Sequence, residues 1–331
     1  RFGDEESKEM FKNRLLYSIT NDLRWTVENI KLVREGKELI EKIEKCAESG
    51  ELVIFGAGMR GEDLCRIFEN YPWKYFVDNY PKIKNIRGVP VISTSYFLEK
   101  YQGEYIFITP KFNNELIHGQ LIQAGISEER IINVGKMQNE LMKNQYFDLT
   151  HLKPAEGKEI FVDIGGYDGM TSVYFGEWSH GKGRSYILEP DTGNIEKCKE
   201  NLANGSVEYH IIPKGAWCEE TTLYFKANAD VSSRISEEGE SVICVTTIDK
   251  VMRENFPTFI KMDIEGAEQQ ALLGARQTIS RCKPKLAISI YHKPEDIWKI
   301  PDIILQYNPS YRFYLRHYTL TESDTILYAV P

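Results

Sequence analysis

The stretch Phe259-Ile-Lys-Met-Asp-Ile-Glu-Gly-Ala-Glu268 decides the fold class of this chain. Residues 259–262 form a short, mostly apolar run without helical periodicity, and acidic residues and a glycine follow at once. This order is typical of an inner strand of a parallel sheet that ends in a turn before a helix. Ligands of such sheets bind beyond the carboxyl ends of the strands. We therefore expect Asp263 and Glu265 at a catalytic crevice.

A second strand of this kind ends in a glycine-rich loop at Glu159-Ile-Phe-Val-Asp-Ile-Gly-Gly-Tyr-Asp-Gly169. No Lys-Ser/Thr pair follows the glycines, so the loop is not a phosphate-binding P-loop. The carboxylate of Asp163 could contact an amino or hydroxyl group of a ligand there. Glu189 ends the next predicted strand, where a carboxylate suits a bidentate hydrogen bond to two ribose hydroxyls. The alternative is that Glu189 only supplies negative charge to a helix N-terminus.

The composition bounds the class of protein. A length of 331 residues predicts two domains. A net charge of −8 argues against a nucleic-acid partner, which needs a basic face. No apolar run reaches membrane-spanning length and no signal-peptide pattern is present, so we expect no membrane partner. The six cysteines are scattered without a C-x-x-C pair, which predicts free thiols in a reducing compartment, the cytoplasm.

Residues 1–50 are predicted to be a helical N-terminal segment. Leu15, Ile19 and Leu23 recur at helical spacing and give an amphipathic face. Gly36 is expected to separate two helices. We interpret the segment as a cap on the following domain or as the contact of a homodimer.

Residues 51–136 are predicted to form a small Rossmann-like domain. A G-x-G-x-x-G pattern, carried by Gly56, Gly58 and Gly61, lies between a predicted strand and a predicted helix, and Asp78 ends the next strand. Such glycines let a pyrophosphate approach the backbone, and the acid suits a ribose hydroxyl. The sequence therefore allows a nucleotide site here. Equally, the glycines could serve only tight packing of helix against strand.

The pattern GAG…VDN…G-x-P-V-I within residues 51–134 resembles the small Rossmann-like domains at the N-terminus of some sugar acyltransferases. That resemblance implies a fold and no activity. Residues 137–158 are polar, contain Pro154 and Gly157, and lack a sustained period, so they are the predicted linker.

Residues 159–331 repeat the alternation of strand and helix and end in two strands without a helix between them. This order predicts a mostly parallel, seven-stranded sheet with an antiparallel last strand. The β-branched stretch at residues 221–248 is expected to form a hairpin. The fold class is thus α/β with two Rossmann-like domains.

Five separated motifs of this domain resemble S-adenosylmethionine-dependent methyltransferases, in particular the FkbM family. They are FVDIGGYDGMTS (161–172), ILEPD (187–191), IKMDIEGAE (260–268) with LLGA (272–275), SIYHKPEDIW (289–298), and YLRHYT (314–319) followed by DTILYA (324–329). Tyr167 departs from the middle glycine of the general methyltransferase loop. The resemblance implies S-adenosylmethionine as cofactor, bound by Asp163, Gly165, Gly166, Asp168, Gly169, Glu189, Pro190, Asp191, Ala216 and Trp217.

The family resemblance also implies methylation of a hydroxyl group on a sugar or another small natural product. An alcohol needs a base or a metal to take or weaken its proton. Asp263, Glu265 and His292 are the candidate catalytic residues, and the sequence leaves the base open among them. Glu268 is interpreted as a charge in the first turn of a helix. A Mg²⁺ held by Asp263 and Glu265 is one option, but no third oxygen ligand stands at a diagnostic spacing, so no metal site is predicted.

Two rival functions remain at this point. A nicotinamide-dependent oxidoreductase or a nucleotide-sugar-binding protein would use Gly56, Gly58, Gly61 and Asp78, although no Tyr-x-x-x-Lys signature accompanies them. A non-catalytic module would bind the methyl donor without turnover, which the acidic residues at 263 and 265 argue against.

Overall fold

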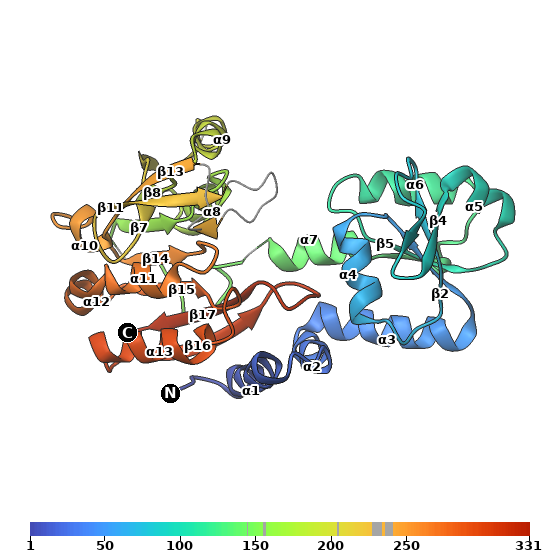
Figure 1. Ribbon diagram of the computed structural model, residues 1–331, viewed down its shortest axis with the longest axis horizontal. Helices are drawn as coiled ribbons and strands as arrows, with labels where there is room; N and C mark the ends of the chain where they lie inside the picture. The colour runs from blue at the N-terminus through green and yellow to red at the C-terminus, as the bar shows by residue number, and fades with distance from the viewer. Residues whose placement is uncertain (144, 155–156, 204, 227–233, 236–240) are drawn as a thin grey trace. The chain divides into compact units, whose positions relative to one another are not determined.

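The computed structural model describes residues 1–143, 145–154, 157–203, 205–226, 234–235 and 241–331. The chain divides into two compact units. Unit 1 contains residues 1–19, 146–316 and 324–331, and unit 2 contains residues 20–145 and 317–323. Each unit is built around its own β-sheet (Figure 1).

The sheet of unit 1 has seven strands and is mostly parallel. Its strands, in spatial order, are β16 (Arg312–His317), β17 (Thr325–Val330), β15 (Lys285–Ser289), β14 (Phe259–Met262), β7 (Glu159–Ile164), β8 (Gly183–Leu188) and β9 (Glu208–Ile212). The last strand, β17, runs antiparallel to β15. The α/β fold class with a mostly parallel, seven-stranded methyltransferase-like sheet is therefore confirmed.

Because β7, β14 and β15 are adjacent and parallel, their carboxyl ends share one edge of the sheet. Strand β14 is fully buried and β7 is buried except at Ile160, as their apolar runs predict. The helices of unit 1 that follow α1 (Glu5–Thr20) are α8 (Met170–Trp178), α9 (Thr192–Leu202), α10 (Ile248–Val251), α11 (Glu268–Leu273), α12 (Arg276–Cys282) and α13 (Asp296–Tyr307). Helix α8 packs beside α9, and α13 packs beside α11 and α12.

Helix α1 (Glu5–Thr20) lies almost wholly in unit 1. Phe2 forms a β-bridge with Phe313, and Arg316 donates a 2.7 Å hydrogen bond to Asp4. The predicted N-terminal segment at residues 1–50 is thus divided between the two units, because its first turn is paired with a strand from the end of the chain.

The predicted hairpin region of unit 1 forms part of a smaller, four-stranded sheet. Its strands, in spatial order, are β10 (Gly215–Ala216), β13 (Ser241–Thr246), β11 (Thr221–Lys226) and β12 (Arg234–Ile235). Strands β11 and β13 pair antiparallel, as a hairpin requires. Residues 227–233 and 236–240 of the expected hairpin lie outside the described residues.

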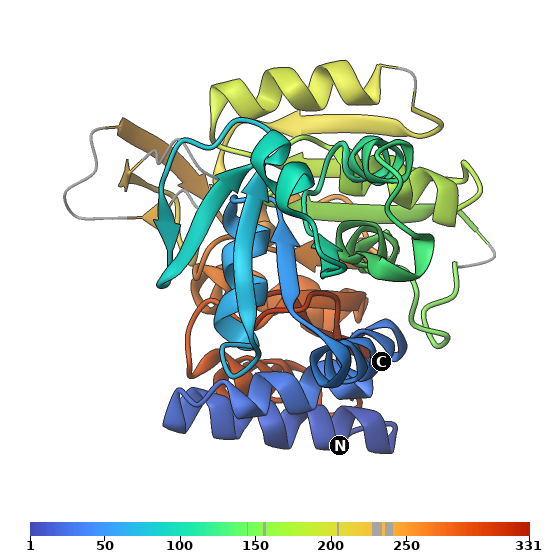
Figure 2. The same cartoon turned by 90° about the vertical axis from the view of Figure 1, so that its right-hand side faces the viewer.

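Unit 2 contains the second large sheet, whose strands run from blue to green in Figure 2. Its strands, in spatial order, are β3 (Asn85–Ile86), β4 (Val89–Ser93), β2 (Trp73–Asp78), β1 (Leu52–Phe55), β5 (Tyr105–Ile108) and β6 (Ile131–Asn133). All its pairings are parallel except that of β3 with β4. Its helices are α2 (Arg24–Leu32), α3 (Arg34–Ser49), α4 (Met59–Ile67), α5 (Thr94–Lys100), α6 (Asn114–Gln123), α7 (Val134–Met142) and the 3₁₀ turn η1 (Glu128–Arg130).

The predicted linker at residues 137–158 begins inside a helix. Helix α7 continues to Met142, and Tyr146 is the first residue of the long segment of unit 1. Within the described parts of the chain, no helix combines the length and the apolar character needed to cross a membrane.

Candidate active site

The glycine-rich loop after β7 depends on two close approaches. Gly165 has a φ of +81°, and a Cβ there would lie 2.0 Å from the carbonyl oxygen of Asp263. A Cβ on Gly166 would lie 2.3 Å from the side chain of Ile187. Tyr167, which departs from the usual glycine, adopts a left-handed φ of 49°, and the residue is 42% exposed. The first two glycines therefore let neighbouring strand ends come together, while their predicted role in binding the methyl donor stays a prediction.

Glu189 fixes the shape of this loop. One carboxylate oxygen, Oε2, accepts a 2.8 Å hydrogen bond from the backbone N–H of Tyr167, and Oε1 accepts one of 2.9 Å from Asp191. Burial raises the pKa of this carboxyl, and the two backbone hydrogen bonds oppose that rise. Each oxygen keeps a second lone pair, so a ligand hydroxyl could still bind there.

Asp163 is fully buried and faces the interior of the protein. Its Oδ1 lies 3.1 Å from the ammonium of Lys261, and its Oδ2 accepts a 3.0 Å hydrogen bond from Ser172. Lys261 also donates a 2.7 Å hydrogen bond to the carbonyl oxygen of Gly165. Burial alone would lower the pKa of Lys261, but the charge of Asp163 reverses that shift. In this arrangement Asp163 shapes the loop from behind, and its contact with a ligand remains a prediction.

Of the other predicted donor-binding residues, four follow β7 or β8 and two lie in or just after β10. Asp191 caps α9 by accepting a 2.8 Å hydrogen bond from Asn194, and Asp168 accepts one of 3.1 Å from Met170. Trp217 follows β10 and donates its backbone N–H to Thr246. The remaining members of the predicted set are Gly169 at the start of α8, Pro190 after β8, and Ala216, which is buried in β10.

Asp263 lies at the end of β14 and is held by aromatic hydroxyls. Tyr146 donates a 2.9 Å hydrogen bond to its Oδ2, and Tyr291 donates one of 3.3 Å to its Oδ1. Burial and the charge of Asp263 raise the pKa of Tyr146 well above its usual value, so this phenol keeps its proton and remains a donor. Both oxygens of Asp263 thus have protein donors.

Glu265 is placed differently from Asp263. Its backbone adopts a left-handed φ of 55°, which costs about 1–3 kcal/mol for a residue with a side chain. Gly266 follows with a φ of +93°. The turn directs Glu265 toward His292, and the side chain remains 26% exposed. Such strain concentrates at functional sites.

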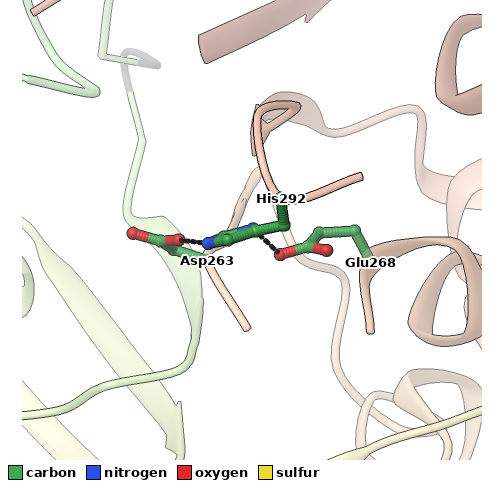
Figure 3. A group of neighbouring side chains, drawn as sticks. All are labelled: Asp263, Glu268 and His292. Carbon is green, nitrogen blue, oxygen red and sulfur yellow. Dashed lines mark ion pairs between the residues drawn. The ribbon is translucent and has the colours of Figure 1, made fainter. Parts of the chain in front are cut away.

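His292 lies between two carboxylates (Figure 3). Its Nε2 is 3.5 Å from Asp263 Oδ1 and 3.5 Å from Glu265 Oε2, and its Nδ1 is 2.9 Å from Glu268 Oε1. Burial alone would lower the pKa of the imidazole, but Glu268, Asp263 and Glu265 raise it to about 9. The structure therefore brings the three predicted catalytic residues together.

The sequence interpretation missed four residues of this cluster: Tyr146, Lys261, Glu268 and Tyr291. Glu268 is the first residue of α11, in agreement with its interpretation as a charge in the first turn of a helix. Its side chain, however, is fully buried against His292. A charged residue inside a fully buried strand signals a buried partner, so Lys261 could have been found. Tyr146 carries no comparable signal, because it lies in a polar segment far from β14 in sequence.

The glycine-rich loop of unit 2 follows β1. A Cβ on Gly61 would lie 2.0 Å from the carbonyl oxygen of Gly56, and one on Gly56 would meet Pro110 and Thr109 at 2.8 Å. Nothing lies within 4 Å of a Cβ on Gly58. Two of the three glycines therefore have packing reasons within unit 2. Asp78 accepts hydrogen bonds from the backbone of Ala57 at 3.1 Å and Tyr80 at 2.8 Å.

Comparison with known proteins agrees with the architecture of unit 1. Residues 163–318 match the family model described as the methyltransferase FkbM domain, which places such a domain in this part of the chain. The crystal structure of methyltransferase FkbM from Methylobacillus flagellatus is similar over 95% of this chain and 100% of that chain, at 23% identity and a TM-score of 0.53. At this identity the similarity shows a shared fold, and the fold extends over residues of both units.

Two further solved structures overlap part of the chain. Fibrillarin from Aeropyrum pernix, in complex with S-adenosyl-L-methionine, covers 59% of this chain and 74% of its own, at 12% identity and a TM-score of 0.36. Precorrin-6y C5,15-methyltransferase from Geobacter metallireducens covers 59% and 86%, at 10% identity and a TM-score of 0.34. No curated protein matches the chain significantly. None of the comparisons supports the resemblance of residues 51–134 to sugar acyltransferase domains.

Proposed function

We propose that unit 1 is an S-adenosylmethionine-dependent O-methyltransferase that acts on a hydroxyl of a sugar or another small natural product. The observation that carries this proposal is the position of Glu189 and Glu265 at one edge of the sheet. Glu189, which follows β8, accepts a hydrogen bond from the glycine-rich loop after β7, and a ribose hydroxyl can donate to its carboxylate beside the two backbone donors. The acidic turn at 263–265 follows β14, which pairs directly with β7.

Within this proposal Glu265 is the base that receives the acceptor proton. Asp263 already accepts two tyrosine hydrogen bonds, and the His292 side chain is only 4% exposed. Glu265 is the most exposed of the three predicted catalytic residues, at 26% against 23% for Asp263. An acceptor hydroxyl can therefore approach its carboxylate.

The transfer is a single displacement at the methyl carbon. The acceptor oxygen forms a bond to that carbon while the carbon–sulfur bond breaks, and its electron pair stays on sulfur. The sulfonium becomes the neutral thioether of S-adenosylhomocysteine, and the hydroxyl proton passes to Glu265 and then to solvent. Positioning supplies much of the acceleration, because the bimolecular step becomes effectively unimolecular.

Calorimetric titration of S-adenosylmethionine into the full chain, with NADH titrated separately, tests the cofactor assignment. We expect the donor to bind, Glu189→Ala to abolish binding, and the matched unit 2 variant Asp78→Ala to leave it unchanged. Binding of NADH alone would move the ligand site to Gly56–Gly61 and favour an oxidoreductase. Donor binding without turnover on any hydroxyl acceptor would indicate a non-catalytic module.

A further inference from the structure

The cluster around His292 contains buried polar atoms that the protein leaves unsatisfied. Among the described residues, Glu268 Oε2, His292 Nδ1 and His292 Nε2 are buried side-chain atoms without a hydrogen bond of acceptable geometry. The 3.5 Å separations from Nε2 to Asp263 and Glu265 exceed the length of an N–H···O hydrogen bond. Buried polar atoms are almost always satisfied, so such a concentration indicates a missing partner.

The charge of the cluster specifies the sign of that partner. Three carboxylates, from Asp263, Glu265 and Glu268, face one imidazole whose side chain is 4% exposed. Lys261, the buried cation nearest in sequence to Asp263, is already paired with Asp163. Ligand atoms of Asp263, Glu268 and His292 lie within 4.8 Å of one another. A cation at Nε2 would balance this charge and give that nitrogen a partner.

We propose that a divalent first-row transition-metal ion binds His292 Nε2 together with the carboxylates of Asp263 and Glu265. Two ligands in tetrahedral positions on bonds of about 2.1 Å are separated by about 3.4 Å. Both carboxylate oxygens are 3.5 Å from Nε2, so each fits beside it on one ion. An imidazole ligand favours iron, nickel or zinc over magnesium and calcium, and the two carboxylates of the site also suit manganese.

Glu268 does not contact this ion directly. Figure 3 shows the imidazole between Asp263 and Glu268, so one ion at Nε2 leaves Glu268 on the opposite ring nitrogen. Its Oε1 lies 2.9 Å from Nδ1 and also accepts a 2.9 Å hydrogen bond from Ile264. A carboxylate behind a metal-bound histidine orients the ring and strengthens its binding. This triad was not predicted from the sequence, because His292 follows a different strand from Asp263.

Manganese binding to the full chain tests the inference directly. Metals are first removed from the protein with a chelator. Mn²⁺ is then added stepwise, and the signal of the unbound ion is followed by electron paramagnetic resonance. We expect one site per chain with micromolar affinity, and electron spin echo modulation from a directly coordinated nitrogen. His292→Ala should abolish both signals. Glu268→Gln should weaken binding by about 10- to 100-fold while the nitrogen modulation persists.

His210→Ala is the matched control, because this exposed histidine also lies near a carboxylate, 3.1 Å from Glu208. It should bind Mn²⁺ as the unchanged chain does. If Mn²⁺ stays free at millimolar concentration, or binds without nitrogen modulation, the inference is wrong. The wild-type spectrum alone decides this, so a variant that does not fold leaves the test intact.

Metal binding does not depend on the proposed function, although any role for the ion in activating the acceptor hydroxyl rests on it. The two ideas can fail separately. Binding of S-adenosylmethionine without Mn²⁺ binding would overturn the metal site alone. Binding of Mn²⁺ without S-adenosylmethionine binding would overturn the methyltransferase assignment alone.

Discussion

The two glycine-rich loops of this chain share the same backbone connections. In unit 2, Asp78 accepts one hydrogen bond from the loop at Ala57 and one from Tyr80, two residues further on. In unit 1, Glu189 accepts one from the loop at Tyr167 and one from Asp191. In both, the first glycine lets the end of an adjacent strand approach.

The loops differ in what the adjacent strand end contributes. The strand end beside Gly56 consists of Thr109 and Pro110, and neither side chain is titratable. Beside Gly165 it is Asp263, which begins an acidic turn that meets His292. A glycine-rich loop and a ribose-type acid are therefore a scaffold, and the neighbouring strand end determines the chemistry.

Alanine at the first glycine of each loop should give the largest effects. Gly165→Ala places a Cβ 2.0 Å from a backbone oxygen, at a residue whose φ is +81°. We expect it to lower the free energy of unfolding of unit 1 by more than about 4 kcal/mol. In Gly56→Ala the added Cβ would lie 2.8 Å from Pro110. We expect this change to lower the free energy of unfolding of unit 2 by about 1–3 kcal/mol. Hydrogen–deuterium exchange resolves the two units. Equal losses would contradict the difference between the loops.

Lys261→Met should destabilise unit 1 by about 3–5 kcal/mol, because it leaves Asp163 buried without its ion pair. The loss would be measured by urea unfolding. The double variant that adds Asp163→Asn removes the buried charge and should recover much of the loss. No recovery would show that Lys261 acts through Gly165 rather than through Asp163.

Replacing the acid of each loop by its amide should have a smaller effect, and only the change in unit 1 should alter the affinity for S-adenosylmethionine. Glu189→Gln should weaken S-adenosylmethionine binding roughly 10- to 100-fold, since one charged hydrogen bond to ligand or loop is lost. Asp78→Asn, its counterpart, should leave that affinity unchanged. Calorimetry measures both. A weaker donor affinity in Asp78→Asn would mean that unit 2 contributes to donor binding.

The smallest expected effect concerns the reactivity of the cysteine thiols in the two units. Burial raises the pKa of Cys198 to about 12 and also raises the pKa of Cys65 in unit 2. At pH 8 only about one part in 10⁴ of Cys198 is thiolate, so alkylation should spare it, whereas exposed Cys244 should react. Reactivity at Cys198 should rise as the pH approaches 12. Mass spectrometry after iodoacetamide treatment identifies the modified cysteines.

The sequence predicted the strands of both sheets well, because apolar runs that end in glycine and acid have few other solutions. It predicted the approach of Asp263, Glu265 and His292 through the order of strands and the family motifs. It could not predict the contacts of Glu268 and Tyr146, since these depend on side-chain direction rather than on spacing. Gly36 was expected between helices, but the break falls at Val33, and Gly36 packs against Ile30 inside α3.

The hydrogen bond from Tyr146 to Asp263 has a consequence for dividing the chain. The family motifs begin after residue 158, so a fragment cut at residue 159 would appear complete by sequence. Such a fragment would lose the phenol that holds one oxygen of Asp263, and also the first helix, whose Asp4 pairs with Arg316. The compact unit that contains the candidate active site is therefore discontinuous in sequence, and the family motifs alone do not mark its ends.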